Sequence, residues 1–512
     1  MTQTIYDLID AQADIGIAIA TPASEAGERS PMSFGRLKQL INDVQSDLNA
    51  LGIGRNDRVA IVLPNGPEMA ASFIAIACSA TTAPLNPAYG REELNFYLED
   101  LKAKALVLAE DDDGPAAEAA QACGIPVIRL ARIEEQPIGV FHLLAEAARV
   151  GDRAATTGFA APADTALVLH TSGTTSRPKI VPLSHQNVTA SAGHIGQALR
   201  LSPMDRCLNI MPLFHIHGLI AAVLSSLAAG ASVWCAPGFN ALKAFNWLDE
   251  VNPTWYTAVP TMHQTILARA PRNKEIIKKL NLRLIRSSSS SLPPQVMTAL
   301  EQVFGCPVLE SYGMTEAAHQ MAANPLPPAA RKPGAVGIAA GPEIAIMNDA
   351  GDLLPQGENG EVVIQGPNVT KGYESNDEAN ETAYTNGWFR TGDQGVLDEE
   401  GYLRLTGRLK EIINRGGEKI SPLEVDEVIM DHPAVAQCVT FAMRHKSLGE
   451  DVAAAVVLKE GQTAGEADIR SFVQSRLVDF KVPRRVLILE EIPKGATGKL
   501  QRIGLAEKLG LG

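Results

Sequence analysis

Hydrophobic and polar positions alternate along the first hundred residues so that helices and strands are predicted in turn. Apolar residues recur with helical spacing from Leu37 to Leu51, and Gly52 follows as a stop signal. The apolar run 57–63 ends at a Pro-Asn-Gly turn and predicts a buried strand, and a helix is expected over 91–102. Further apolar runs predict strands at 82–85, 105–109, 165–170, 207–211, 232–235, 255–258 and 282–286.

This alternation predicts a mainly parallel sheet in a layered α/β body. After about residue 345 the pattern changes to shorter strands separated by turns, at 343–348, 360–365 and 401–406, which indicates a β-rich subdomain.

A second unit is expected near the C-terminus. At its first helix Ser421 can cap, Pro422 suits the first helical position, and Glu424 can close a capping box. Strands near 435–441, 452–458 and 486–489 and a helix over 466–478 complete a small α+β domain.

The length and net charge of the chain limit the classes of function that it can have. A chain of 512 residues is too long for one simple domain. The formal net charge of −13 argues against nucleic acid or a membrane surface as the main partner, because both are anionic. The six cysteines form no CxxC pair, which predicts free, buried thiols in a reducing compartment. No secretory signal, long apolar span or peroxisomal tail is visible, so the cytoplasm is expected.

The segment 171–179 carries the sharpest local signal, Thr-Ser-Gly-Thr-Thr-Ser-Arg-Pro-Lys, directly after the predicted strand 165–170. Its hydroxyls, glycine and backbone N–H groups can surround phosphate oxygens, and Lys179 adds a cation. It is not a Walker loop, because Pro178 stands where the second glycine should be. The alternative is a polar surface loop.

Three further motifs follow in order. In Ser311–Glu316 an aromatic ring can stack on a purine and a carboxylate can hold Mg²⁺. In the next motif Asp393 can accept hydrogen bonds from both ribose hydroxyls. Near the C-terminus Lys499 lies in a glycine-containing loop that could deliver positive charge to a transition state. Each motif alone also fits a surface turn or a solvated charge.

Together, and in this order, these motifs resemble the adenylate-forming superfamily of acyl-CoA synthetases, luciferases and peptide-synthetase adenylation domains. The resemblance runs from Asp57 to Lys499. It implies a large N-terminal AMP-binding domain, residues 1–408, and a small mobile C-terminal lid, residues 409–512. It also implies an ATP-dependent acid–CoA ligase, in which the acid attacks the ATP α-phosphate, releases pyrophosphate and forms an acyl-AMP that then accepts the thiol of CoA.

The resemblance assigns a role to each matching position. It implies that Lys499, Thr315 and Glu316 are catalytic, with Thr315 at the α-phosphate, Glu316 on Mg²⁺ and Lys499 between the acid and the α-phosphate. Tyr312 would stack on adenine, and Asp393 and Arg408 would bind the ribose. The β- and γ-phosphates would be bound by Thr171, Ser172, Gly173, Thr174, Thr175 and Lys179. Ser176 departs from the usual glycine of the family.

The lid is used twice in this family. Lys410 matches the hinge position, and Gly416 and Gly417 match the loop that lines the CoA channel, where a side chain would obstruct the thiol. The expected small molecules are therefore ATP, Mg²⁺, CoA and a carboxylic acid, with no obligatory protein partner.

The identity of the acid depends on three polar sites. His215, Ser289 and His319 are expected around the acid, where hydroxyls and a histidine suit a second carboxylate. The stretches 255–264 and 318–327 and the serine run 287–291 resemble the oxalate–CoA ligase branch, which implies oxalate as substrate. The serines could equally form a solvated loop, and His217 could be a core histidine.

Other activities remain open at this point. A medium-chain or aryl acid–CoA ligase is the alternative within the enzymes. Loading of a carrier protein is less favoured, because Gly417 suits a free CoA channel. A non-catalytic nucleotide-binding regulator would keep the fold without the chemistry, but the motif residues Glu316, Asp393 and Lys499 are all present.

Overall fold

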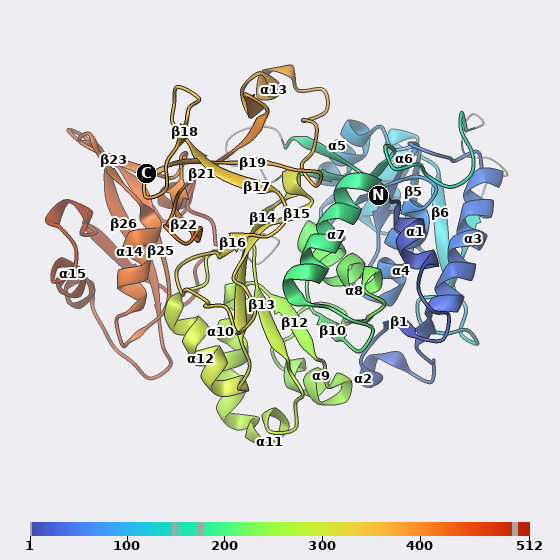
Figure 1. The fold of residues 1–512 in the computed structure, drawn as a ribbon, viewed down its shortest axis with the longest axis horizontal. Helices are drawn as coiled ribbons and strands as arrows, with labels where there is room; N and C mark the ends of the chain where they lie inside the picture. Colours follow the sequence, from blue (N-terminus) through green and yellow to red (C-terminus); the bar gives the residue numbers. More distant parts are fainter. Residues whose placement is uncertain (1–2, 146–149, 151–153, 172–177, 494–499, 512) are drawn as a thin grey trace.

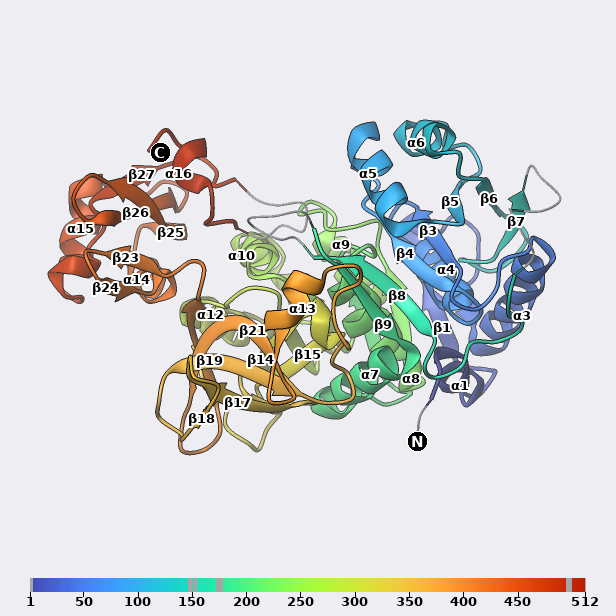
Figure 2. The ribbon, with the colours of Figure 1, turned by 90° about the horizontal axis from the view of Figure 1, so that it is seen from above.

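The computed structural model describes residues 3–145, 150, 154–171, 178–493 and 500–511. Two large sheets, a smaller antiparallel sheet and a C-terminal sheet follow one another from the N-terminal to the C-terminal part of the chain (Figure 1). The C-terminal sheet lies at one end of the long axis of the molecule (Figures 1 and 2).

The first large sheet has parallel strands in its centre and one antiparallel strand at each edge. Its central strands are buried along almost their whole length, as strands covered on both faces are. In spatial order the strands are β7 (Phe141–Ala145), β6 (Val127–Arg132), β5 (Ala105–Ala109), β3 (Arg58–Val62), β4 (Thr81–Pro84), β8 (Thr165–His170) and β9 (Ile180–Ser184).

The second large sheet repeats this plan: its central strands are parallel, and its edges are antiparallel. In spatial order its strands are β16 (Ile338–Ala339), β15 (His319–Ala323), β14 (Val308–Met314), β13 (Leu284–Ser287), β12 (Trp255–Ala258), β10 (Arg206–Asn209), β11 (Ser232–Cys235), β1 (Ile17–Ala20) and β2 (Met32–Ser33).

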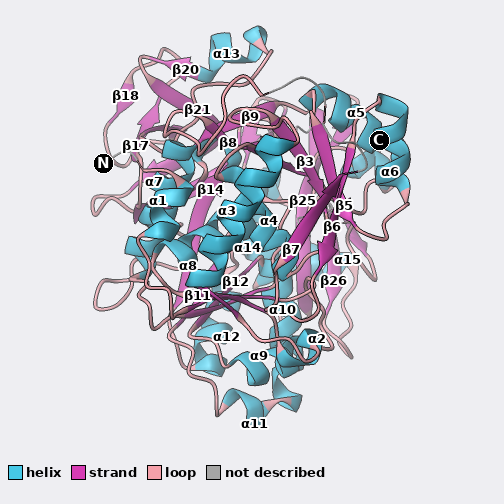
Figure 3. Ribbon diagram, turned by 90° about the vertical axis from the view of Figure 1, so that its right-hand side faces the viewer, coloured by secondary structure: helices cyan, strands magenta, loops and turns pink. Residues whose placement is uncertain are grey.

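Helices α4 (Pro67–Ala77) and α7 (His185–Leu199) contact strands of both large sheets and therefore form the layer between them. The π-helical segment η1 (His217–Leu224) packs against both helices. Figure 1 places α4, α7 and α8 further inside the molecule than α3, which lies at its outer edge, and in the view of Figure 3 α3 lies beside α4. The other helices before residue 320 are α1 (Ile5–Asp10), α2 (Ala23–Ala26), α3 (Phe34–Ala50), α5 (Arg91–Leu101), α6 (Pro115–Cys123), α8 (Ser225–Ala228), α9 (Ala244–Val251), α10 (Pro260–Arg269), η2 (Ala270–Arg272), α11 (Lys274–Ile277), α12 (Pro294–Phe304) and η3 (Thr315–Ala317).

The β-rich subdomain is an antiparallel sheet. Its elements are β17 (Glu343–Met347), β18 (Leu353–Leu354), β19 (Gly360–Gln365), α13 (Asp377–Ala383), β20 (Tyr384–Thr385), β21 (Trp388–Leu397) and β22 (Leu403–Arg408). It packs on the hairpin β14–β15 through a shared apolar cluster that includes Tyr312, Met321 and Phe389.

The C-terminal sheet begins at Ile413, directly after a turn at 408–412. Its core of valine, isoleucine and alanine side chains is separate from that of the body. Its elements are β23 (Ile413–Arg415), β24 (Glu418–Ile420), α14 (Pro422–Met430), β25 (Val435–His445), β26 (Gly449–Leu458), α15 (Glu466–Gln474), η4 (Asp479–Lys481), β27 (Arg485–Ile488) and α16 (Leu505–Lys508). The predicted boundary between residues 408 and 409 remains a prediction.

Most predicted elements lie where the hydrophobic pattern placed them, and three local details differ. The strand expected to reach residue 211 ends at Asn209, whose side chain accepts the Met211 N–H (3.0 Å) and turns the chain. The last predicted helix ends at Gln474 rather than 478. Ser421 caps α14 as expected, but Glu424 does not close the capping box, because its carboxylate pairs with Lys481 (2.7 Å).

Two expectations from composition can be compared with the fold. All six cysteines are free, and all but Cys123 are buried, as predicted. In the part of the chain that the structure describes, no helix combines the length and apolarity needed to cross a bilayer.

Glu310 on β14 is a buried carboxyl group with an unusual environment. Its Oε1 accepts the backbone N–H of Leu292 (2.7 Å), and among the described residues Oε2 has no hydrogen-bond partner. Burial raises the pKa of Glu310 to about 8. The group therefore remains protonated near neutral pH and anchors the end of the serine run.

We expect Glu310→Gln to weaken the pH dependence of stability. The unfolded chain releases this proton near pH 4.5 but the folded chain only near pH 8, so wild-type stability should fall as the pH rises between these values. Gln keeps the acceptor for Leu292 and does not titrate. Thermal unfolding at pH 5 and pH 8 should show E310Q gaining stability relative to wild type at the higher pH. An unchanged difference would contradict the raised pKa.

Candidate active site

Tyr312, Asp393 and Arg408 come together from three strands. The Tyr312 hydroxyl donates to Asp393 Oδ2 (2.5 Å), and Arg408 Nε donates to Asp393 Oδ1 (2.9 Å). Strands β21 and β22 pair Asp393 directly with Arg408, while Tyr312 lies on β14 in the adjoining sheet. Two of the residues that the sequence assigned to adenine and ribose, Tyr312 and Arg408, are thus both hydrogen-bonded to the third, Asp393.

The electrostatics of this trio match its predicted task. The nearby Asp393 carboxylate raises the pKa of Arg408. Burial, followed by the charge of Asp393, raises the pKa of Tyr312 well above its usual value, so the phenol stays a neutral donor. The carboxylate of Asp393 is therefore held in one orientation, with little freedom left to lose when a ligand binds.

Glu316 and Lys179 meet at a tyrosine that the sequence analysis did not select. The Tyr373 hydroxyl donates to Glu316 Oε1 (2.8 Å), and Lys179 Nζ lies 4.3 Å from the centre of the Tyr373 ring. Lys179 is also tied to Thr171 at the base of the predicted phosphate loop, because its carbonyl accepts the Thr171 N–H (2.9 Å). Burial raises the pKa of Glu316.

The residues around Glu316 fit the predicted Mg²⁺. The described residues contain no group of three or more His, Cys, Asp and Glu side chains that could hold a metal ion. Mg²⁺ commonly binds through one or two carboxylates together with substrate phosphates and water. A single buried carboxylate beside Lys179 suits that mode of binding.

A second polar cluster lies between η1 and strands β12, β13 and β15, and we call it the arginine cluster. Its members are Arg286, His217, Thr257, Ser289, His319 and Gln320. Arg286 Nη1 lies 3.4 Å from His217 Nε2, and Nη2 lies 3.4 Å from His319 Nδ1 and 3.2 Å from Gln320 Oε1. His217 Nδ1 lies 2.9 Å from the Ser289 hydroxyl.

Among the described residues, no carboxylate balances the charge of Arg286. Its side chain is fully buried, its Nε has no hydrogen-bond partner among the described residues, and no described carboxylate forms an ion pair with it. Burial lowers the pKa of Arg286 to about 9, so at neutral pH it is still a cation. A buried cation without a counter-ion is costly, which favours an anionic ligand at this position.

Arg286 also fixes the tautomers of its two histidine neighbours. A guanidinium can only donate, so His217 Nε2 and His319 Nδ1 must accept. In the neutral rings the proton then lies on His217 Nδ1 and on His319 Nε2. His217 consequently donates to Ser289, and the one N–H donor of neutral His319 is Nε2, on the side of the ring away from Arg286.

The three residues predicted around the acid are only partly brought together. Ser289 and His319 both belong to the arginine cluster, but Ser289 bonds to His217 rather than to His215. Nδ1 of His215 instead faces the backbone N–H of His217 (3.3 Å). Thr257 and Gln320 lie within the stretches 255–264 and 318–327 that the sequence analysis had quoted, and Arg286 precedes the serine run.

The backbone around the arginine cluster is unusual. Ser289, Ala318 and His319 have positive φ values of 75°, 47° and 101°. Gly313 pairs with Gln320 in the hairpin β14–β15, next to the pair of Met314 and His319, and a Cβ on Gly313 would lie 1.8 Å from the His319 carbonyl oxygen. Glycine at 313 therefore allows the close approach that sets the position of His319.

Gly313→Ala should displace His319 and weaken use of the acid. The clash with the His319 carbonyl is with backbone, so we expect a destabilisation of about 1–3 kcal/mol together with a raised KM for the acid. Gly193→Ala in α7 is the control, since a Cβ there meets nothing within 4 Å and the helix should be slightly stabilised. Thermal unfolding measures the stability of the two variants, and acid-dependent kinetics measure their KM for the acid. G313A behaving like G193A would contradict this account.

A cavity of about 130 Å³ separates the body from the C-terminal domain. Its body wall includes Ser290, Ser291 and Thr261, and its other wall includes Leu500 and Arg502. Leu500 directly follows position 499, so the chain next to Lys499 faces the serine run. Lys499 itself lies outside the described residues, as do Ser172, Gly173, Thr174, Thr175 and Ser176.

The remaining predicted residues belong to the hinge and the C-terminal domain. Lys410 is exposed in the turn at 408–412. Gly416 and Gly417 have φ values of 61° and 100° and make their backbone hydrogen bonds within the C-terminal domain. A Cβ on Gly417 would meet nothing within 4 Å in this arrangement, so its predicted role in a CoA channel stays a prediction.

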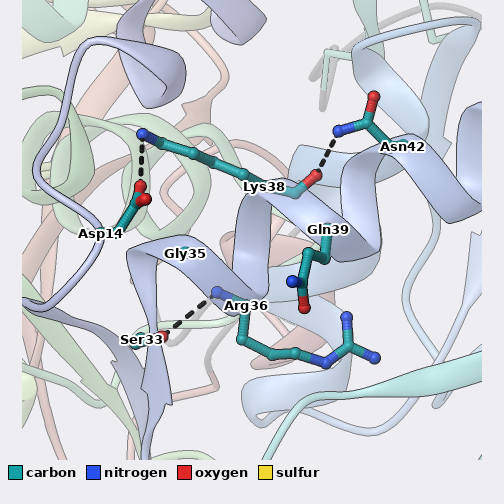
Figure 4. Close-up of a pocket in the computed structure, with 7 residues that line it drawn as sticks. All are labelled: Asp14, Ser33, Gly35, Arg36, Lys38, Gln39 and Asn42. Atoms are coloured by element: carbon teal, nitrogen blue, oxygen red, sulfur yellow. Dashed lines mark hydrogen bonds and ion pairs between the residues drawn. The ribbon is translucent and has the colours of Figure 1, made fainter.

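A larger surface depression, of about 540 Å³, lies at the N-terminal end of α3 (Figure 4). Its polar groups bond to one another: Lys38 pairs with Asp14 (2.8 Å), and Ser33 accepts the Arg36 N–H (3.1 Å). None of the predicted site residues lines it.

Comparison with known proteins was made on sequence and on structure. The AMP-binding enzyme family matches residues 17–374, and the AMP-binding enzyme C-terminal domain matches residues 424–499. The chain is 46% identical to the oxalate–CoA ligase of Arabidopsis thaliana, over 92% of each chain. It is 41% identical to the oxalate–CoA ligase of Saccharomyces cerevisiae, over 88% of this chain and 87% of that one.

Among solved structures, ATP-bound MatB from Rhodopseudomonas palustris superposes with a TM-score of 0.86 at 31% identity, over 99% of each chain. The two chains therefore share their fold over almost their whole length.

Proposed function

The chain belongs to the AMP-binding enzyme family, and from this membership and the arginine cluster we infer that it is an AMP-forming oxalate–CoA ligase. The proposed reaction converts oxalate, CoA and ATP into oxalyl-CoA, AMP and pyrophosphate. One oxalate carboxylate attacks the α-phosphate and releases pyrophosphate. The thiol of CoA then takes the oxalyl group from the acyl-AMP and releases AMP.

The buried and uncompensated charge of Arg286 carries the choice of acid. A second carboxylate next to the reacting one would balance this cation, whereas a methyl or alkyl group would leave it unpaired. Ser289 is the partly exposed member of the cluster, and His319 has a donor on its far side, so these two residues would contact the distal carboxylate. Arg286 is buried behind Ser289 and His319, and its positive charge would stabilise the distal carboxylate without contacting it.

The residues proposed to bind the nucleotide are the trio Tyr312, Asp393 and Arg408 and the predicted phosphate loop 171–179. Asp393 and Arg408 would hold the ribose, Tyr312 would stack on adenine, and Lys179 with the loop from Thr171 would bind phosphate oxygens. When bound, Mg²⁺ would neutralise phosphate charge beside Glu316. Lys499 would reach the acid and the α-phosphate from the side where Leu500 faces the body.

We also propose that the two domains have different roles. Residues 1–408 would hold the nucleotide and the acid, and residues 409–512 would act as a lid that pivots near Lys410. That pivot would bring Gly416 and Gly417 to the CoA thiol in the second half-reaction.

A panel of acids tests this proposal. Pyrophosphate release should be fastest with oxalate, weaker with other short dicarboxylates, and at least about 100-fold slower with acetate or octanoate, because these acids leave Arg286 unpaired. Octanoate or 4-coumarate turned over faster than oxalate would overturn the substrate and keep the ligase class. No acid-dependent pyrophosphate release at all would favour a regulator that binds nucleotide without catalysis.

A further inference from the structure

Tyr373 joins two motifs that are far apart in the sequence. Its hydroxyl donates to Glu316 Oε1 at 2.8 Å, and its ring faces Lys179 at 4.3 Å. Glu316 follows β14, whereas Lys179 closes the predicted phosphate loop before β9. No other described side chain hydrogen-bonds to the Glu316 carboxylate, so this tyrosine alone fixes its orientation within the described residues.

The backbone of Tyr373 is held rigidly. The Asn380 side chain binds it on both sides, since Oδ1 accepts the Tyr373 N–H (2.8 Å) and Nδ2 donates to the Tyr373 carbonyl (2.7 Å). The next residue, Glu374, forms an ion pair with Arg58 and donates its N–H to the Ile180 carbonyl (3.0 Å). This segment is also tied to Glu316 itself, whose carbonyl accepts the Thr370 N–H (2.7 Å).

The chemistry of the phenol suits a permanent donor. Burial is the main cause that raises the pKa of Tyr373 above its ordinary value, and the charge of Glu316 adds to it. The hydroxyl donates to the carboxylate, because an ionised carboxylate oxygen can only accept. A carboxylate with one oxygen occupied in this way presents the other oxygen in a fixed direction.

We propose that Tyr373 is a positioning residue for Mg²⁺·ATP: its hydroxyl aims the Glu316 carboxylate at the metal, and its ring holds Lys179 for the phosphates. This inference rests on the proposed function. Partners of metal-binding carboxylates orient the ligand, and their loss typically weakens metal affinity about 10-fold to 100-fold. The face of an aromatic ring attracts the lysine ammonium and restricts where it lies.

Tyr373→Phe is the direct test, because it removes the hydroxyl and keeps the ring that packs in the fold. Binding of Mn²⁺ to the enzyme–ATP complex, followed by the electron paramagnetic resonance signal of free Mn²⁺, should weaken by roughly 10-fold to 100-fold. The Mg²⁺ concentration that half-saturates pyrophosphate release should rise by a similar factor. Thermal unfolding should be close to that of the wild type.

Tyr384→Phe is the matched control. Tyr384 belongs to the same subdomain and donates its hydroxyl to the Thr370 carbonyl rather than to Glu316. Its loss should change Mn²⁺ affinity by no more than about 3-fold, since the carboxylate keeps its partner. Equal weakening in Y384F and Y373F would mean that the subdomain is merely loosened, and the inference would be overturned.

Glu316→Gln separates this inference from the function on which it rests. Unchanged Mn²⁺ affinity in E316Q would refute the metal role of Glu316 itself. Weakened affinity in E316Q with wild-type affinity in Y373F would refute only the role of Tyr373. Tyr373→Leu should weaken ATP binding beyond Y373F, because Lys179 loses the ring, and equal ATP affinity in both variants would exclude that part of the proposal.

Discussion

Replacing Arg286 by methionine should lower kcat/KM for oxalate by roughly 10-fold to 150-fold, corresponding to the 1.5–3 kcal/mol of an interaction with a charged group. Methionine has a similar length but no charge, so the distal carboxylate loses its counter-ion. The two histidines also lose the donor that fixes their tautomers. The stability of the unliganded protein should stay the same or rise, because a buried charge without a partner opposes folding.

Arg283→Met provides the opposite pattern as a control. Arg283 lies one residue before β13 and pairs with Asp205 (3.0 Å), so its loss breaks an ion pair that includes no member of the arginine cluster. We expect R283M to be less stable than wild type but to keep kcat/KM for oxalate within a few-fold. Steady-state kinetics and thermal unfolding of both variants decide the matter. Oxalate turnover in R286M equal to that in R283M would rule out an acid-binding role.

Lys499→Ala should lower the adenylation half-reaction by about 100-fold to 1,000-fold, as removal of one preorganised donor to a transition state does. Thioester formation from preformed acyl-AMP should stay within a few-fold of wild type, since the proposed pivot of the lid would withdraw Lys499 before that step. ATP affinity should also be largely kept, because Asp393, Arg408 and the predicted phosphate loop are the residues proposed to bind ATP.

The two half-reactions are measured separately. Acid-dependent pyrophosphate release reports adenylation, and acyl-CoA formation from added acyl-AMP reports the second step. Lys508→Ala is the control, since it removes an exposed lysine from α16 near the same end of the chain. Equal losses in both half-reactions of K499A would show that the assigned role is wrong.

The hydrophobic pattern was sufficient to predict the layered body. The central strands are buried on both faces and therefore read as continuous apolar runs, which is why 105–109, 165–170, 232–235 and 255–258 match the observed strands. Strand ends were less predictable where a side chain took over a backbone hydrogen bond. The Asn209 side chain accepts the Met211 N–H, and the strand ends there. The Glu424 carboxylate pairs with Lys481 and does not cap α14.

The residues predicted to bind the nucleotide lie in short sequence motifs, and the trio Tyr312, Asp393 and Arg408 is found in contact, while its ligand stays a prediction. The arginine cluster was harder to predict, because its members come from four separate segments. Arg286 lies inside a strand whose other residues are apolar or small, so only its burial marks it as unusual. Tyr373 follows an ordinary Lys-Gly pair, and nothing in the sequence relates it to Glu316 about sixty residues away.

The position of Arg408 has a consequence for the catalytic cycle. This residue ends β22 beside Asp393 and stands two positions before Lys410, the residue proposed as the pivot of the C-terminal domain. When AMP leaves, Asp393 and Arg408 would lose the ribose that they are proposed to bind. These two residues lie next to the proposed pivot of the C-terminal domain. Product release and the return of the C-terminal domain would then be a single kinetic event, and the slow step of steady-state turnover would be sensitive to solvent viscosity.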